Sequence, residues 1–328
     1  MPKLNKIPLL TIIIPTYNRS NYLSKLLKNL EEQILGEEDK VKVLILDNCS
    51  TDSTKSEVEK FTKTNNYFHY IKNESNIGPD SNFLKGYKNV FSNYFWFIGD
   101  DDLPRKGFIK LLINFLQNNS PSLIYLQSFW DKNIETNQLE KLFNLEFYQY
   151  NLKLFAKKTH VFSTFISSWI INKSELPKSF KKIESLKNTN FIQLGWILPL
   201  YKESSNLYFV NRKVILASKG NTRGGYKLIN TFGCKFPKII KCFNFKDKSI
   251  SDLIIRSFLK SFLPKLILGK KIGLYKDKIS HKNISYELIE NLKKYPEFWF
   301  YCFPILIIPE TITVNLYKIY CKIFSKIN

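Results

Sequence analysis

The chain has 328 residues, of which 44% are hydrophobic and 15% aromatic. It can therefore bury enough apolar surface to offset the conformational entropy lost on folding, which excludes an intrinsically disordered protein. The formal net charge of +22 would suit a nucleic-acid-binding protein, but the abundance of Lys together with Asn, Ile, Phe and Tyr also fits an AT-rich genome.

The basic residues are concentrated towards the C-terminus. Residues 235–328 contain 18 Lys and Arg against 7 Asp and Glu, a net charge of +11 and half of the total excess. The same segment holds Phe298-Trp299-Phe300-Tyr301 and Ile305 to Ile308, a mixture of basic and apolar residues typical of segments that lie on a membrane surface. A nucleic-acid-binding protein would spread its lysines and aromatics over one face of the core. We therefore expect an anionic membrane surface as a partner, and no nucleic acid.

The cysteines and the N-terminal sequence indicate in which cellular compartment the protein is expected. The five cysteines are scattered and lack C-x-x-C spacing, which predicts reduced thiols. The N-terminus runs directly into a strand-like block without the apolar core and cleavage site of a signal peptide. No stretch reaches the roughly 18 apolar residues that a spanning helix needs. We expect a cytoplasmic protein, peripheral on the inner face of the cytoplasmic membrane.

Short apolar runs alternate with amphipathic segments from Leu9 to Ser128. The runs have the length and composition of buried strands; they are Leu9 to Ile14, Val41 to Leu46, Phe68 to Ile71, Tyr94 to Ile98 and Leu123 to Leu126. The segments between them have apolar residues at helical spacing; they are Asn21 to Gln33, Ser53 to Lys63, Ser81 to Phe91 and Arg105 to Leu116. This alternation predicts an α/β fold with a mainly parallel sheet and helices on both faces.

The pattern is less regular beyond Gln127. Val161 to Ile171 reads as a strand or short hairpin, Asn190 to Tyr201 as a helix, and Val210 to Ser218 as another strand. Gly220 to Gly225 reads as a flexible loop. After Phe236 the chain becomes helical and basic, so we expect a domain boundary near residue 235.

Three consecutive carboxylates, Asp100-Asp101-Asp102, follow the fourth apolar run. Like charges this close raise each other's pKa unless a cation lies between them. Mg²⁺ and Mn²⁺ are typically held by one or two carboxylates together with substrate phosphates. The alternative is a cap for the helix that begins near Pro104, but a cap needs one Asp rather than three. The triplet therefore predicts a Mg²⁺ or Mn²⁺ site with Asp100 and Asp102 as ligands.

Other polar residues follow the first two apolar runs, where the carboxyl ends of parallel strands bind ligands. Thr16-Tyr17-Asn18-Arg19 follows the first run, and Asp47 follows the second. A carboxylate there can accept hydrogen bonds from a nucleobase or a ribose hydroxyl. One member of Ser50-Thr51-Asp52 is expected to cap the next helix.

A turn precedes the third helix. Asn76-Ile77-Gly78-Pro79 and Asn82 fit ordinary turn and cap chemistry as well as a ligand role. Gly86 inside that helix costs about 1 kcal/mol relative to Ala, which predicts close packing against the sheet or a ligand.

The sequence lacks the motifs of several other enzyme classes. The sequence contains no phosphate-binding loop with Lys and Ser/Thr, and no G-x-G-x-x-G after the first strand, which argues against a kinase and a dehydrogenase. His69, His160 and His281 are too widely separated to predict a zinc site.

Four blocks of this sequence, in their order and spacing over roughly residues 8 to 120, resemble glycosyltransferase family 2. Any one block is weakly specific, whereas four in register are strongly specific. The blocks are Pro15-Thr16-Tyr17-Asn18-Arg19, Leu46-Asp47-Asn48-Cys49-Ser50-Thr51-Asp52, Asn76-Ile77-Gly78 with Asn82 and Gly86, and Gly99-Asp100-Asp101-Asp102-Leu103-Pro104. The last block is similar to that of members that build bacterial surface polysaccharides, abequosyltransferase-like enzymes among them.

The resemblance implies a GT-A fold. Residues 1–125 would form the nucleotide-sugar-binding half, residues 126–234 the acceptor-binding half, and residues 235–328 a basic helical appendage. The implied nucleotide-binding residues are Pro15, Thr16, Tyr17, Arg19, Asp47, Asn76, Gly78, Asn82, Asp100 and Asp101, and the triplet would supply the metal-binding DxD function.

The implied reaction is metal-dependent, inverting transfer of a sugar from a nucleotide-diphosphate donor to a glycan or lipid-linked sugar acceptor. Asp102 and Glu184 are the catalytic candidates, Glu184 as general base. Many family members carry an acidic pair where this chain has Lys187 to Asn190, so Glu175 and His160 are rivals for the base.

Three alternatives remain open. A sugar nucleotidyltransferase of the same fold would have a glycine-rich basic loop after the first strand, which Thr16 to Arg19 does not resemble. A basic nucleic-acid-binding protein and a catalytically inactive member of the fold are the others.

Overall fold

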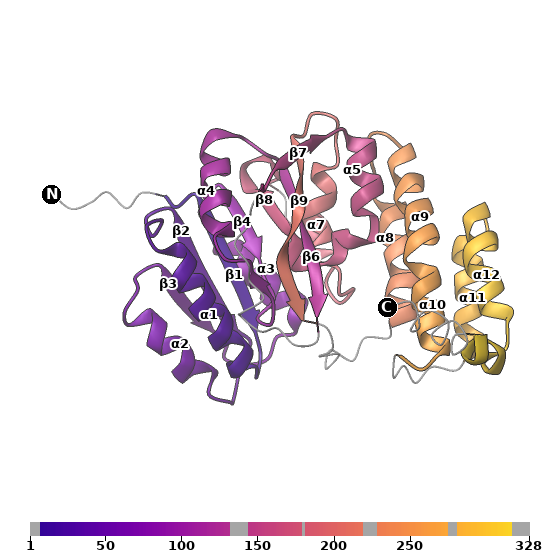
Figure 1. The fold of residues 1–328 in the computed structure, drawn as a ribbon, viewed down its shortest axis with the longest axis horizontal. Helices are drawn as coiled ribbons and strands as arrows, with labels where there is room; N and C mark the ends of the chain where they lie inside the picture. Colours follow the sequence, from indigo (N-terminus) through magenta and orange to yellow (C-terminus); the bar gives the residue numbers. More distant parts are fainter. Residues whose placement is uncertain (1–6, 132–143, 179–180, 219–227, 275–280, 317–328) are drawn as a thin grey trace. The chain divides into compact units, whose positions relative to one another are not determined.

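The computed structural model describes residues 7–131, 144–178, 181–218, 228–274 and 281–316 (Figure 1). The chain divides into two compact units. The first unit comprises Met1–Phe155 and Phe162–Asn221, and the second comprises Ala156–Val161 and Thr222–Asn328. The division into two functional halves and an appendage, with a boundary near residue 235, stays a prediction.

One sheet organises the first unit. Within the described residues it has nine strands in the order β3-β2-β1-β4-β8-β6-β9-β5, with β7 paired to β9. The strands are β1 (Leu10–Thr16), β2 (Val41–Asp47), β3 (Phe68–Lys72), β4 (Tyr94–Phe97), β5 (Leu103–Pro104), β6 (Leu123–Asp131), β7 (Phe147–Tyr150), β8 (Trp169–Asn172) and β9 (Leu207–Ser218). Strands β3, β2, β1 and β4 pair in parallel, whereas β8 is antiparallel to both β4 and β6. The predicted α/β fold is confirmed, with antiparallel strands added in the second half of the sheet.

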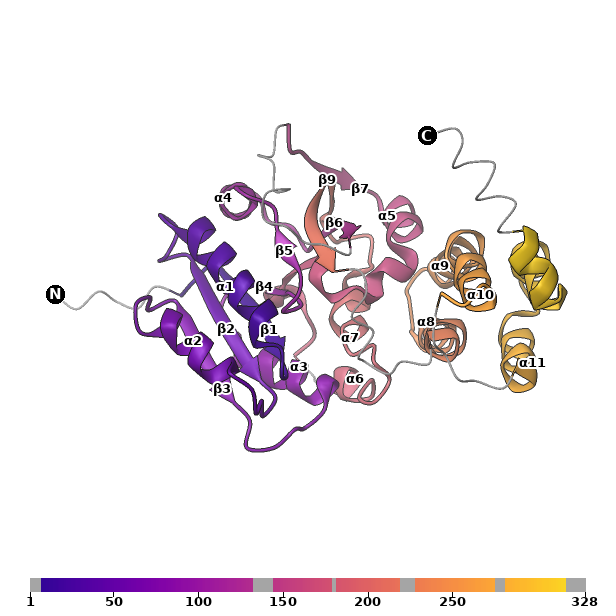
Figure 2. The same cartoon turned by 60° about the horizontal axis from the view of Figure 1, so that its bottom comes forward.

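The four helices expected between the early strands are confirmed. They are α1 (Ser20–Ile34), α2 (Thr54–Thr62), α3 (Pro79–Lys88) and α4 (Phe108–Asn118). Helices α1 and α4 pack on one face of the sheet and α3 on the other (Figure 2). Both faces are therefore covered, which explains why the early strands read as continuous apolar runs.

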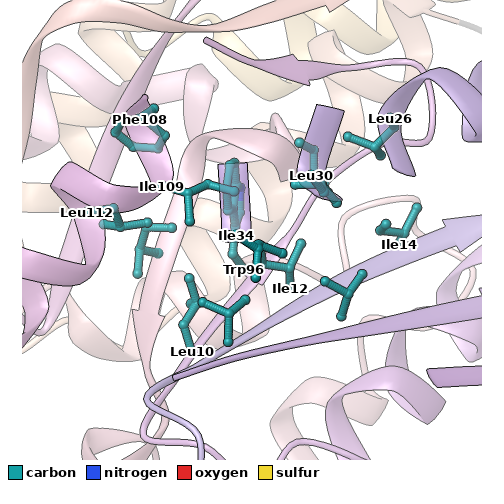
Figure 3. Close-up of a cluster of buried hydrophobic side chains, with 14 of the residues drawn as sticks. Leu10, Ile12, Ile14, Leu26, Leu30, Ile34, Trp96, Phe108, Ile109 and Leu112 are labelled. Atoms are coloured by element: carbon teal, nitrogen blue, oxygen red, sulfur yellow. The ribbon is translucent and has the colours of Figure 1, made fainter. Parts of the chain in front are cut away.

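Successive side chains of β1 point to opposite faces of the sheet. Leu10, Ile12 and Ile14 pack with residues of α1 and α4 in one buried cluster (Figure 3). Ile13 faces α3, where a Cβ on Gly86 would lie 2.9 Å from Ile13 Cγ2 and 2.4 Å from Leu46 Cδ1. The predicted close packing of Gly86 against the sheet is confirmed.

Two predicted elements of the second half are wrong in part. Val161 to Ile171 is a strand only from the start of β8; before it the chain forms two 3₁₀ turns, η2 (His160–Thr164) and η3 (Ile166–Ser168). The turn at Ser167 instead hydrogen-bonds to the loop after β4, which keeps it out of the sheet. The predicted helix over Asn190 to Tyr201 is confined to α7 (Leu194–Ile197) and the 3₁₀ turn η5 (Leu198–Leu200), because Asn190 has a φ of +68° and Pro199 interrupts the helix.

The other predictions for the second half concern one strand and one loop. The strand predicted over Val210 to Ser218 is confirmed within β9, while β5 and β7 were not predicted. The loop Gly220 to Gly225 lies outside the described residues.

The second unit is helical where it is described, as predicted for the basic C-terminal region. It contains the π-helical turns η6 (Ile229–Lys235) and η7 (Phe298–Cys302) and the helices α8 (Phe236–Cys242), α9 (Ser249–Ser261), α10 (Leu263–Lys271), α11 (His281–Leu292) and α12 (Phe303–Ile307). Among the helices described, none alone has the length and apolar content to cross a membrane. Phe298–Ile307 and Glu310–Leu316, bent by 105° at a short break, meet that requirement only as a pair.

Candidate active site

The loops that follow β1 and β2 are held together at the carboxyl edge of the sheet. Thr16 and Asp47 end these strands side by side. Asn18, at a φ of +53°, accepts a hydrogen bond from the Thr51 amide at 2.8 Å through its side chain. Asp52 accepts from the amides of Ser20 and Thr54 at 3.1 Å each. One carboxylate therefore joins the starts of α1 and α2. The prediction that Ser50, Thr51 or Asp52 caps α2 is wrong, because the helix begins one residue later and its N-cap is Ser53.

The first two carboxylates of the acidic triplet contact the loop after β1. The Thr16 hydroxyl donates to Asp100 Oδ2 at 2.8 Å, and Arg19 Nη1 lies 2.9 Å from Asp100 Oδ1. The second guanidinium nitrogen of Arg19 pairs with Asp101. The structure thus brings together Thr16, Arg19, Asp100 and Asp101, which were predicted from two of the sequence blocks.

Asp102 turns in the other direction, towards the second half of the sheet. The Ser167 hydroxyl donates to Asp102 Oδ2 at 2.5 Å, and the Ser218 amide donates to Oδ1 at 3.2 Å. A Cβ on Gly99 would lie 3.0 Å from Asp102 Oδ2, so the glycine before the triplet leaves room for this carboxylate. Sequence reasoning missed Ser167 and Ser218 as its partners. The available clue was a serine inside the apolar stretch Val161 to Ile171.

Burial makes the triplet an electrostatically unfavourable place for negative charge. Asp100 is 3% exposed and Asp102 4%. Burial, reinforced by the charge of Asp101, raises the pKa of each of these two carboxyls to about 7. Arg19 offsets part of this effect at Asp100. Among the residues that the structure describes, the site therefore has more carboxylates than cations.

The described residues contain no group of three or more His, Cys, Asp and Glu side chains that could hold a metal ion by themselves. Mg²⁺ and Mn²⁺ do not require such a group, because substrate phosphates commonly complete their coordination. The arrangement therefore fits an ion that binds together with a diphosphate rather than a structural metal.

Asp47 is fully buried beneath the second loop. Its Oδ1 accepts from the Ser50 amide at 2.7 Å, and its Oδ2 accepts from the Tyr70 hydroxyl at 2.5 Å. The carboxylate thus fixes the shape of the loop. Its predicted contact with a nucleobase or ribose stays a prediction.

Asparagine side chains connect the second loop to the start of α3. Asn48 accepts from Asn73 Nδ2 at 3.0 Å and donates to Asn76 Oδ1 at 2.8 Å. Asn82 accepts from Asn73 Nδ2 at 3.0 Å and donates to the Leu46 carbonyl at 3.1 Å. Asn76 and Asn82, which were predicted as site residues, therefore belong to one amide network. Its other two members, Asn48 and Asn73, were not predicted as site residues.

The remaining predicted nucleotide-binding residues lie on the same edge. Tyr17 exposes 44% of its surface between Thr16 and Asn18, while Pro15 is partly buried at the end of β1. Gly78 has a φ of +80°, a conformation that favours glycine, and precedes the first turn of α3. Tyr17 thus offers an accessible aromatic face beside the triplet's partners.

The structure does not bring Glu184 to the triplet. Its carboxylate lies 3.7 Å from Lys88 Nζ, at the last residue of α3. Of its rivals, Glu175 accepts from the Ser122 hydroxyl at 2.8 Å, and His160 lies in the second unit 3.2 Å from Ser261 Oγ. Across the described ranges, no hydrogen bond or ion pair joins any of the three to the triplet. The base role of Glu184 stays a prediction.

Buried carboxyls with a raised pKa predict a pH-dependent stability. Between an unfolded-state pKa near 4 and about 7, the folded state binds more protons than the unfolded state, so the free energy of unfolding falls as pH rises. We expect Asp102→Asn to gain roughly 1–3 kcal/mol relative to wild type between about pH 5 and pH 8. Urea unfolding without divalent ions measures this gain. A pH-independent difference, or an equal gain for the exposed control Asp39→Asn, would contradict the assignment.

The sequence matches the model of a known family. Residues 11–176 match the model of the family described as "Glycosyl transferase family 2", a little over half of the chain. The abequosyltransferase RfbV of Salmonella typhimurium is 34% identical over 119 residues, 36% of this chain and 35% of that protein. A GalNAc(5)-diNAcBac-PP-undecaprenol beta-1,3-glucosyltransferase of Campylobacter jejuni is 29% identical over 107 residues, 32% of this chain and 34% of that protein. The matches thus span about a third of the length of these relatives.

Solved structures share the fold over more of the chain. TarS 1-349 of S. aureus in complex with UDP-GlcNAc has a TM-score of 0.60 at 17% identity, covering 87% of this chain and 80% of that one. The mannosyltransferase PcManGT of Pyrobaculum calidifontis, in complex with GDP-Man and Mn²⁺, has a TM-score of 0.55 at 13% identity, covering 89% and 88%. The expected GT-A fold is confirmed. Since the family model covers a little over half of the chain, the chain belongs to glycosyltransferase family 2.

Proposed function

We propose that this glycosyltransferase moves a sugar from a nucleotide-diphosphate donor to a lipid-linked glycan acceptor, with inversion and with Mg²⁺ or Mn²⁺, in bacterial surface-polysaccharide synthesis. The observation that carries the proposal is the pair of buried carboxylates, Asp100 and Asp102, at the carboxyl edge of a parallel sheet. Their pKa is raised to about 7; in the described part of the chain Arg19 pairs with Asp100, and no cation pairs with Asp102.

The residues present fit a divalent ion. Carboxylate oxygens are the ligands that Mg²⁺ and Mn²⁺ prefer, and Asp100 and Asp102 would hold the ion. A carboxylate oxygen has two acceptor sites, so Asp102 can keep its bonds from Ser167 and Ser218 while it binds a cation. Such an ion, when bound, stabilises the charge that develops on a departing nucleoside diphosphate. The Mn²⁺ in the PcManGT complex supports this proposal.

The same loops offer groups for the rest of the donor. Arg19 has five N–H donors and uses two nitrogens on the triplet, so its guanidinium can also contact phosphate oxygens. The exposed face of Tyr17 suits stacking with a nucleobase. The two solved structures support a nucleotide-sugar donor, since one is a complex with UDP-GlcNAc and the other with GDP-Man.

Inversion needs a group that takes the proton of the acceptor hydroxyl during attack on the sugar. Glu184 is the proposed base. Its carboxylate lies 3.7 Å from Lys88 and is 44% exposed, so an acceptor can reach it. A base role requires Glu184→Gln to lose turnover while it still binds donor, whereas unchanged turnover would remove Glu184 from the mechanism.

A lipid-linked acceptor would place the enzyme at the inner face of the cytoplasmic membrane. The Campylobacter relative's name contains a diphosphate-linked undecaprenol acceptor. In the second unit, exposed apolar side chains follow one another along η7, α12 and the segment after it; they are Trp299 41%, Phe300 78%, Tyr301 47%, Ile307 63%, Ile312 50% and Leu316 57%. Aromatic and aliphatic side chains among lysines are typical of peripheral membrane segments.

The donor site is tested with a panel of nucleotide sugars. Wild-type protein should gain thermal stability with one donor only when Mg²⁺ or Mn²⁺ is present, and should slowly hydrolyse that donor to the nucleoside diphosphate. Asp102→Asn should lose both responses, with turnover reduced by about 100-fold or more, while the exposed Asp39→Asn keeps them. Metal-independent binding would contradict the proposal. Release of pyrophosphate from a nucleoside triphosphate and a sugar phosphate would favour the nucleotidyltransferase alternative.

Membrane binding is tested by flotation with vesicles of phosphatidylcholine and phosphatidylglycerol. Replacing Phe300 and Ile307 by serine should weaken membrane binding by about 30-fold or more, since each buried apolar side chain contributes roughly 1–2 kcal/mol. A matched variant with serine at Leu35 and Phe91, which are 79% and 72% exposed in the first unit, should float like wild type. Equal flotation of both double variants would exclude the proposed surface.

A further inference from the structure

A surface cavity in the second unit has a strongly basic lining. Its volume is about 370 Å³, and it lies between the end of α8, the start of α9 and the segment after α11. The lining includes Lys241, Lys248 and Lys294 but only one carboxylate, Asp252, a net charge of +2. None of these residues belongs to the donor site or to the exposed apolar surface described above.

The single carboxylate does not neutralise the lysines. Asp252 accepts from the Tyr295 hydroxyl at 2.8 Å and lies 3.6 Å from Lys294 Nζ. In the part of the chain that the structure describes, no carboxylate lies within 4.0 Å of Lys241 or Lys248. The cavity therefore has two ammonium groups without a carboxylate in direct contact, and Asp252 acts on Lys241 only from a greater distance.

Lys241 is partly buried, so the lack of a carboxylate in contact with its ammonium group raises the free energy of the charged form. Its ammonium donates to the Asn291 carbonyl and lies 5.5 Å from the centre of the Tyr295 ring. Both groups attract a cation, but neither has a net negative charge. Burial lowers the pKa of Lys241, and the neighbouring charge of Lys294 lowers it further. An anion in the cavity would reverse both effects.

The shape of the cavity limits the ligand. Phe243 and Phe245, whose ring centres are 4.7 Å apart, add aromatic side chains to the lining. Lys248 is exposed at the start of α9. A volume of about 370 Å³ is larger than one phosphate needs and is within the range of small-molecule sites. The cavity therefore suits an anionic group attached to a further, partly apolar moiety.

We propose that this cavity binds the phosphate group of a diphosphate or phosphodiester, with Lys241, Lys248 and Lys294 as its cationic contacts. Lysine binds phosphate as a compact point charge, without the planar geometry that arginine requires. The ligand can be a soluble diphosphate or the headgroup of an anionic lipid, because both present the same chemistry. The proposal does not depend on the donor site, since its residues lie in the second unit and the donor residues in the first.

The test measures the acetylation rate of each lysine by mass spectrometry, on the full-length protein. One arm adds inorganic pyrophosphate, and a second adds phosphatidylcholine vesicles with or without phosphatidylglycerol. We expect Lys248 and Lys294 to be protected in a saturable way, reaching about tenfold at a ligand concentration ten times the dissociation constant. Protection by pyrophosphate identifies a soluble ligand, whereas protection only by vesicles that contain phosphatidylglycerol identifies a lipid headgroup. Either result supports the proposal.

Matched charge reversals separate the cavity from general basicity. Lys248→Glu/Lys294→Glu should weaken binding of the protecting ligand by about tenfold or more, since each lysine near an anionic surface contributes about 1 kcal/mol. Lys238→Glu/Lys265→Glu changes the net charge equally at exposed positions of the same unit, outside the cavity, and should bind like wild type. The proposal is overturned if neither arm protects the cavity lysines, if Lys238 and Lys265 are protected equally, or if both double variants lose binding to the same extent.

Discussion

The burial of two carboxylates beside a single guanidinium is the constraint on which the site depends. Asp100 and Asp102 are nearly inaccessible, and the negative charge around them exceeds what Arg19 supplies. Such buried negative charge destabilises a folded protein unless a bound partner neutralises it. The sheet makes this possible because three loops from its carboxyl edge fix Arg19, Thr16 and the triplet relative to one another.

Much of the fold could be predicted because its first half obeys simple rules. Strands buried on both faces read as continuous apolar runs, and the helices between them keep helical spacing. Gly86 predicted close packing of α3 against the sheet or a ligand because glycine is costly inside a helix, and the structure decides for the sheet. The second half failed where tertiary contacts replace sheet pairing, as at Ser167, whose bonds to the loop after β4 have no local sequence pattern.

The site residues likewise fall into those that a local sequence pattern predicts and those that only tertiary contacts bring in. The triplet, Thr16 and Arg19 were predicted because each directly follows a strand, and parallel strands bring their ends together. Ser167 lies in the turn η3 and Ser218 at the end of β9, and both are placed by long-range contacts, so spacing along the chain could not associate them with Asp102. Glu184 was chosen by its position in the sequence rather than by a contact, and the structure pairs it with Lys88 instead.

The central claim is that the charge of the triplet is completed by a divalent ion that arrives with a nucleoside diphosphate. Anomalous scattering from crystals grown with Mn²⁺ and a nucleoside diphosphate tests it most directly. The account predicts a manganese peak bound by the Asp100 and Asp102 carboxylates and by the diphosphate. A diphosphate bound at these loops with no manganese at the triplet, and with Arg19 still bridging Asp100 and Asp101, would contradict it.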